Sequence, residues 1–222
     1  MKNLFPILVF LMFCTCKQSD KTQIPTTELS VAQKIANAHG IQNWDMVSRI
    51  DFTFNVDRDS SHFERSWQWE PKTNMVTMIS GDETTHFNRA KIDSTTLKAD
   101  RSFINDKYWL LAPFNLVWDE GTTISEPMLK EAPISKKQLH KITLTYSNEG
   151  GYTPGDAYDF YYGEDYIIKE WVFRRQNSKE ASLICSWESY QNINGIKIAQ
   201  EHKKMDGNWN LNFTNLKVIM EK

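Results

Sequence analysis

The strictest pattern in this chain is the alternation of apolar and polar residues between positions 50 and 57. Ile50, Phe52, Phe54 and Val56 take every second position, and polar residues fill the positions between them. Successive side chains of a β-strand point to opposite faces, so this pattern predicts a strand with one face in a core and the other in water. A chain built on such strands has to bury one face of a sheet.

Segments with similar strand signals recur along the chain, and most are separated by turn residues. The predicted strands cover residues 50–57, 63–70, 74–80, 83–90, 139–145, 158–162, 167–174, 181–190, 196–205 and 209–220. Runs of consecutive strands joined by turns predict antiparallel pairing. A sheet of about ten strands tends to curl rather than stay flat.

Two segments have helical spacing instead. The first covers residues 28–38, with Thr27 as its cap and Gly40 at its end. The second covers residues 95–111, and Pro113 is expected to end it. Both carry apolar faces that have to lie against a sheet. The predicted fold is therefore α+β: a curved antiparallel sheet, or open half-barrel, with two helices packed in its concave face.

Residues 1–15 have the composition of a secretory signal. Lys2 supplies a positive charge, and the apolar stretch 4–13 is shorter than the roughly 20 residues of a membrane-spanning helix. Cys16 follows the small residue Thr15, which resembles the cleavage box of bacterial lipoproteins. We therefore expect cleavage after residue 15 and acylation of Cys16. Ordinary secretion with cleavage nearby and no lipid is the alternative.

Residues 16–27 are polar with one proline, and we expect them to serve as anchor and flexible tether. Residues 28–222 are then a single domain, because a chain of this length suits one domain and can bury most of its surface. Cys185 is the one cysteine in this part. It alternates with apolar neighbours in a predicted strand, which indicates a buried thiol and leaves no disulfide within the domain.

No motif for catalysis is present. The chain lacks a nucleophile elbow, a phosphate-binding loop and a dinucleotide fingerprint, so we predict no enzyme activity, no catalytic residues and no cofactor. His62 and His86 could meet across neighbouring strands, but no third ligand is evident and no metal site is predicted. His39 stands at a predicted helix end, where a cation is favourable. The formal net charge of −2 argues against a nucleic-acid partner.

The order of the elements resembles the LolA/LolB-like fold of periplasmic lipoprotein carriers. Four short segments also resemble uncharacterised Gram-negative lipoproteins with that predicted fold. These segments are residues 38–44, 67–70, 107–114 and 194–198. The resemblance implies a hydrophobic hollow able to hold an acyl chain. Lys17 differs from the aspartate that retains lipoproteins in the inner membrane, so the resemblance implies a lipid anchor in the outer membrane and a domain facing the periplasm.

The predicted ligand-binding residues lie on one strand and one helix. Phe52 and Phe54 would form the strand side of the hollow, and Ile104, Tyr108 and Leu111 would form the helix side. Apolar walls with few polar groups suit a lipid or an acyl chain.

A second predicted strand adds three more residues. Trp67 and Trp69 share a face, and core packing under a helix is favoured over a place at the mouth of the hollow, because most large aromatic residues are buried. Arg65 shares this face and would be costly there unless paired or at the rim. At the rim it would hold a lipid phosphate or carboxylate.

The sequence therefore favours a lipid-anchored periplasmic binding protein that holds a lipid or a lipoprotein acyl chain. Its partners would be that ligand, the membrane through the N-terminal anchor, and an envelope protein. The alternative is a non-enzymatic structural or interaction lipoprotein of the cell envelope with a closed core. Such a protein would recognise its partner through loops such as 147–156 or 120–137.

Overall fold

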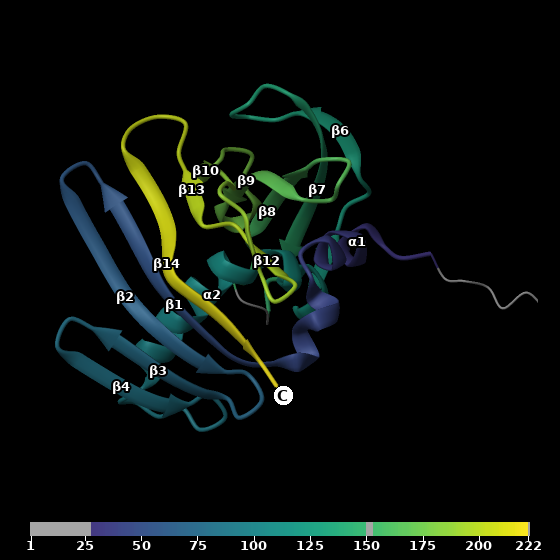
Figure 1. The fold of residues 1–222 in the computed structure, drawn as a ribbon. Coiled ribbons are helices and arrows are strands. Elements are labelled where there is room, and N and C mark those ends of the chain that lie inside the picture. Colours follow the sequence, from purple (N-terminus) through teal and green to yellow (C-terminus); the bar gives the residue numbers. More distant parts are fainter. Residues whose placement is uncertain (1–27, 150–152, 222) are drawn as a thin grey trace, which may run out of the picture.

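The computed structural model describes residues 28–149 and 153–221. In chain order the elements are α1 (Val31–Ala38), the short 3-10 helix η1 (Ile41–Met46), β1 (Val47–Arg58), β2 (Ser61–Glu70), β3 (Met75–Ser80), β4 (Glu83–Asn88), α2 (Leu97–Trp118), β5 (Thr122–Ile124), β6 (Met128–Glu131), β7 (Gln138–Tyr146), β8 (Ala157–Tyr162), β9 (Ile168–Arg174), the 3-10 turn η2 (Arg175–Asn177), β10 (Leu183–Ser186), β11 (Gln191–Ile193), β12 (Ile196–Ile198), β13 (Glu201–Lys203) and β14 (Trp209–Met220) (Figure 1).

The strands form two open six-stranded sheets and one small hairpin. Sheet A has the order β13-β14-β1-β2-β3-β4. Sheet B has the order β10-β9-β8-β7-β5, with β6 also paired to β7, and β11 pairs with β12. All strand pairs among the described residues are antiparallel. The predicted class, α+β with open antiparallel sheets and two main helices, is confirmed.

The strands are more numerous and more divided than the predicted ten. The predicted strand 196–205 is broken into β12 and β13, and the segment 120–137 contributes β5 and β6. Short polar-rich strands of this kind carry too few residues for an alternation to stand out. The interruption also ends the hydrogen bonding between what would have been one curved sheet, so two separate sheets face the helices.

The alternating residues that open the fold do face the core. Ile50, Phe52 and Phe54 of β1 are all buried. On β2, Trp69 lies opposite Ile50 and Trp67 lies opposite Phe52. On the other side, β14 places Phe213 beside Phe54. The central pair of strands therefore presents one aromatic surface to the interior.

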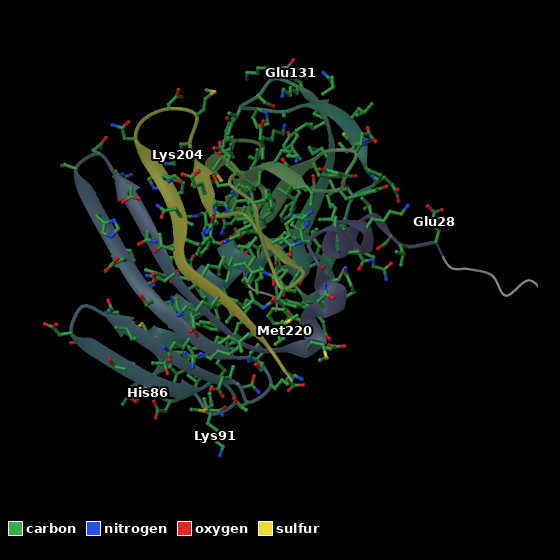
Figure 2. The ribbon with its side chains drawn as sticks, viewed as in Figure 1. Glu28, His86, Lys91, Glu131, Lys204 and Met220 are labelled. Carbon is green, nitrogen blue, oxygen red and sulfur yellow. The ribbon has the colours of Figure 1, made fainter. Side chains whose placement is uncertain are left out.

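Helix α2 lies between the two sheets (Figure 1). Its side chains toward sheet A include Phe103, Leu110, Leu111 and Phe114. Its side chains toward sheet B are Tyr108, Ala112 and Leu116. Figure 2 shows side chains filling the region around α2, with Lys204 and Met220 near opposite ends of the sheet A strands that cover it. A helix that is apolar on two sides is expected to be buried between layers.

Helix α2 passes through Pro113, so the prediction that Pro113 ends it is wrong. The helix continues to Trp118, and the break falls at Leu111, whose backbone (φ −127°, ψ 27°) is not helical. A proline in a helix interior removes a hydrogen bond and collides with the carbonyl four residues earlier. The break at Leu111 places Pro113 in the first turn of a new helical segment, where a proline is tolerated.

Helix α1 starts later than predicted. Ser30 is its cap, and its hydroxyl accepts from the backbone N–H of Gln33 while the Gln33 side chain accepts from the backbone N–H of Ser30. This reciprocal pair fixes the start at Val31. The predicted cap Thr27 lies outside the described residues. The end is as predicted, since Gly40 has the left-handed conformation that closes a helix (φ 95°).

His39 is a neutral core residue, not the predicted cation. Its ring is buried, and Nδ1 lies 2.8 Å from the carbonyl oxygen of Ile35. Burial lowers its pKa to about 4, so the ring carries no charge near neutral pH. His202 of β13 is buried in the same way, and burial lowers its pKa to about 3.

His62 and His86 do not meet across the sheet. His86 pairs with Thr77, which pairs with Gln68, six positions along β2 from His62. That offset corresponds to roughly 20 Å along a strand. Across residues 28–149 and 153–221, no three His, Cys, Asp or Glu side chains are grouped to hold a metal ion. Cys185 is a buried thiol in β10, as predicted.

None of the helices in the described part of the chain is both long and apolar enough to cross a bilayer.

Candidate functional site

The structure brings most of the predicted hollow residues together as a packed cluster. Phe52, Phe54, Trp67, Trp69 and Leu111 are all buried in the apolar core between sheet A and α2. The ring of Phe103 meets both tryptophans edge-on, with centroids 5.3 Å from each. The tryptophan pair therefore acts as core beneath α2 in this structure, and the space between sheet A and the helix is filled by side chains.

Arg65 forms an ion pair with α2. Its Nε and Nη2 donate to the two carboxylate oxygens of Asp106 at 2.5 and 2.7 Å. The indole N–H of Trp67 donates to the same carboxylate at 2.8 Å, and the side chain of Asp106 is 0 % exposed. Two charge-assisted bonds and one neutral bond fix α2 against β2. Arg65 can reach a ligand only with the outer part of its side chain.

That outer part lines a shallow groove at the start of α2. The groove is lined by Arg65, Ser94, Leu97, Lys98, Arg101, Ser102 and Asn105. Among the described residues, Lys98 and Arg101 form no ion pair, so the groove is positively charged. It is open and its cations are exposed, which makes it a surface feature rather than an enclosed site.

The remaining two predicted residues, Ile104 and Tyr108, line a pocket on the other side of α2. The other residues of this pocket are Arg89, Lys107, Asn115, Trp118, Asp119 and Glu120. Its cavity volume is about 280 Å³. We refer to it as the α2 pocket. It combines apolar walls with several polar groups, which is the usual composition of a small-molecule site.

Lys107 is the cation nearest the centre of the α2 pocket. Its Nζ donates to Oδ1 of Asn115 at 3.3 Å and lies 5.6 Å from the ring centroid of Trp118. Burial lowers the pKa of Lys107 to about 8, and the charge of Arg89 acts in the same direction while Asp119 opposes it. The ammonium group is therefore still mostly charged at neutral pH and is incompletely compensated.

Asn115 supplies a second polar group to the α2 pocket. The residue is 1 % exposed, and its Nδ2 is buried without a hydrogen-bond acceptor among the described residues. A buried amide donor without an acceptor costs about 1–3 kcal/mol. Such a group is expected to find a partner when a ligand enters.

The floor of the pocket is a short chain of hydroxyl groups. The hydroxyls of Tyr108 and Tyr146 are 3.4 Å apart, and the Tyr146 hydroxyl donates to Oδ2 of Asp119 at 2.5 Å. Burial raises the pKa of both tyrosines, so both stay protonated. The Asp119 carboxylate is thus partly satisfied from below and contributes its charge to the pocket from one side.

Sequence reasoning missed Lys107, Asn115 and Trp118. The signal for the first two was present, because they are the polar residues within a long apolar stretch of α2. It was overlooked because the helix was expected to end before Pro113, which removed Asn115 and Trp118 from it. Asp106 was missed as the partner of Arg65, since nothing in the pattern links residues so far apart.

Comparisons with known proteins give a fold and no more. No protein-family model and no curated protein matches the sequence. A LolA superfamily protein from Nitrosomonas europaea is similar in structure, with 11% sequence identity over 86% of this chain and 94% of that chain and a TM-score of 0.48. A DUF1329 family protein from Desulfovibrio piger is 8% identical over 85% of this chain and 90% of that chain, with a TM-score of 0.43. The first is of the LolA-like fold type that the sequence resembles, and the likeness extends no further than the fold.

Proposed function

We propose that this chain is a lipid-anchored binding protein of the cell envelope that holds a lipid or the acyl chain of a lipoprotein. The observation that supports this best is the amphiphilic α2 pocket. Ile104, Trp118 and the ring of Tyr108 supply apolar walls, while Lys107 and Asn115 supply polar contacts at one place. A ligand with an apolar chain and one polar end fits such a lining.

The size of the pocket says how the ligand would enter. Its volume of about 280 Å³ is just below the roughly 300–1,000 Å³ of typical ligand pockets, so it suits a head group and the first carbons of a chain. The rest of the chain would pass between α2 and sheet A, where Phe52, Phe54 and Leu111 now pack. The break in α2 at Leu111 is the place where one half of the helix can move relative to the other.

The anchor belongs to the same proposal. Acylation of Cys16 would hold the domain at the membrane through residues 16–27, and the expected placement is the periplasmic side of the outer membrane. The ligand would then be taken from or delivered to that membrane, and an envelope protein would be the other partner of the exchange.

The test is mass spectrometry of lipids that co-purify with residues 17–222. This part of the chain contains every residue of the apolar clusters, so we expect it to fold without the signal. Ile104→Trp fills the α2 pocket, and Leu97→Trp on the same helix is the matched control because Leu97 is 40 % exposed and lies outside the pocket. We expect one lipid per wild-type and Leu97→Trp molecule and much less on Ile104→Trp. Lipid-free protein that also ignores added acyl probes would end the proposal.

The second candidate is an interaction protein with a closed core. It is favoured by the dense packing beneath α2 and by the edge strand β6, where Met128 and Leu129 are 51 % and 63 % exposed. Exposed apolar residues on a sheet edge invite pairing with another chain. The same lipid analysis separates the two candidates, because this one requires a lipid-free wild-type protein.

A further inference from the structure

We propose that the α2 pocket receives the head group of its ligand as a monoanion, a carboxylate or a phosphodiester, with Lys107 and Asn115 as the direct contacts. This inference rests on the proposed function and adds the chemical class of the polar end of the ligand. It is carried by two donors that the protein itself leaves without acceptors.

Lys107 has donors to spare. An ammonium group has three N–H bonds, and its one hydrogen bond runs to Asn115 at a long 3.3 Å. No carboxylate of the described residues lies within 4.0 Å of its Nζ. A half-buried cation without a paired anion is unfavourable unless something supplies the negative charge. A bound oxyanion would supply it.

The amide of Asn115 is oriented to help. Its Oδ1 accepts from Lys107, so its Nδ2 points elsewhere into the pocket lining and has no acceptor among the residues described. The reverse assignment of the amide would aim two donors at each other, which confirms the orientation. Because Nζ and Nδ2 flank the same amide oxygen, one carboxylate or phosphodiester can contact both.

The other charges of the pocket limit the ligand to one negative charge. Arg89 is already paired with Asp100, its Nε donating at 2.9 Å. Asp119 and Glu120 face the same space and repel a second negative charge. The surplus of the site is therefore the single charge of Lys107, which a monoanion balances and a dianion exceeds.

The experiment is a calorimetric titration of residues 17–222 with three ligands that share one chain, at about pH 7.5. Dodecanoate is a monoanion, dodecanol is neutral, and dodecyl phosphate is largely dianionic at this pH. We expect dodecanoate to bind at least about tenfold more tightly than either of the others, because a charge-assisted bond to a buried donor is lost in dodecanol and repulsion is added in the phosphate.

Three variants tie the preference to the two donors. Lys107→Met removes the charge and Asn115→Asp supplies an internal anion, and each should bring the affinity for dodecanoate down to that for dodecanol while leaving dodecanol binding unchanged. Lys98→Met, on the exposed side of the same helix, should change neither. Unchanged dodecanol binding also shows that a variant is folded.

The outcomes separate this inference from the proposed function. Equal affinity for dodecanoate and dodecanol, or full dodecanoate binding by Lys107→Met, overturns the head-group assignment and leaves acyl binding standing. Failure of both long-chain ligands to bind overturns the proposed function and this inference together. Tightest binding of dodecyl phosphate, or loss of binding in Lys98→Met alone, also overturns the assignment. A short-chain phosphatidylglycerol that competes with dodecanoate identifies a phospholipid as the source of the monoanion, and its failure to compete identifies a fatty acid.

Discussion

Gly40 and Gly195 lie backbone against backbone, so close that a Cβ atom on Gly40 would overlap the carbonyl oxygen of Gly195. Two hydrogen bonds hold the contact: the backbone N–H of Lys197 donates to the carbonyl of His39 at 2.9 Å, and Nδ2 of Asn43 donates to the carbonyl of Gly195 at 3.1 Å. Two of the four segments by which the sequence resembles envelope lipoproteins therefore meet in space. Their glycines are required by this contact and not by a ligand.

Replacing Gly40 should therefore unfold or strongly destabilise the domain. Gly40→Ala combines a left-handed backbone with a collision against main-chain atoms, so we expect a loss of more than about 3 kcal/mol in the free energy of unfolding. Gly207→Ala is the matched control, because Gly207 has a similar φ of +82° but open space around it. Its cost should stay near 1 kcal/mol, roughly the backbone penalty alone. Urea titrations give both values, and equal losses would contradict the close contact.

The ion pair between Arg65 and Asp106 should be worth far more than a surface pair. Asp106→Asn keeps an acceptor for Trp67 but leaves the Arg65 guanidinium without its anion, so we expect a loss of about 3–5 kcal/mol in urea unfolding. Asp51→Asn is the control, since the Arg49–Asp51 pair is more exposed and should cost under about 1 kcal/mol.

A small loss in Asp106→Asn would mean that the fixing of α2 to β2 rests on packing alone. If Asp106→Asn does not fold, the double replacement of Arg65 and Asp106 by leucine should recover stability. Removing both partners of a buried pair is far less costly than removing one.

Stability should fall as the pH drops below neutral. His39 and His202 have folded-state pKa values of about 4 and about 3, below the roughly 6.5 of an unfolded histidine. Below about pH 6.5 the unfolded chain binds protons that the folded chain excludes, so each histidine removes about 1.4 kcal/mol per pH unit until its folded pKa is reached. Between pH 7 and 5 we expect each to remove roughly 2 kcal/mol, measured by urea unfolding at both values.

The contributions of the histidines can be isolated by replacement. His202→Phe should reduce the pH slope by about half, because the ring already packs among Trp187, Trp109 and Phe213. His62→Gln should leave it nearly unchanged, since His62 is exposed and its hydrogen bond to Asp57 raises its pKa instead. A wild-type slope that does not change with His202→Phe would contradict a neutral, buried ring.

Binding of an anionic acyl ligand should weaken above about pH 8. The pKa of Lys107 is about 8, so deprotonation removes the charge that attracts the ligand, while the charges of Arg89, Asp119 and Glu120 stay the same. Dodecanoate affinity should therefore fall between pH 7 and 10, and dodecanol affinity should stay constant. Lys107→Arg should bind dodecanoate at both pH values, because guanidinium remains charged. A pH-dependent dodecanol affinity would point to unfolding instead.

The strands were predictable from the sequence because alternation survives where one face is buried. The pattern fails to run through β14, and the structure gives the reason: Leu211 and Phe213 face the core, and Val218 does so only after a bulge has shifted the register. Asn215, with a φ of 52°, lies within that bulge. A bulge inverts the alternation without leaving a clear mark in the sequence.

The site was less predictable because it depends on one helix break. Proline normally ends a helix, and a local rule cannot register that a single non-helical residue, Leu111, lets α2 resume. Asn115 and Trp118 reach the pocket only because it does. The aromatic residues were rightly chosen as interior, yet sequence does not distinguish a filled interior from an open one, because both require apolar side chains.

The pairing of β1 with β14 joins the first and the last strand of the domain. A chain exported N-terminus first presents β1 and β2 long before β14 emerges, so the middle of sheet A waits for the final residues with an unpaired edge. Premature folding on the way across a membrane is thereby discouraged, since the central strand has no second neighbour until export is complete. The same order means that truncation near the C-terminus would expose the aromatic face of β1, and quality control in the envelope would meet it as an aggregation-prone edge.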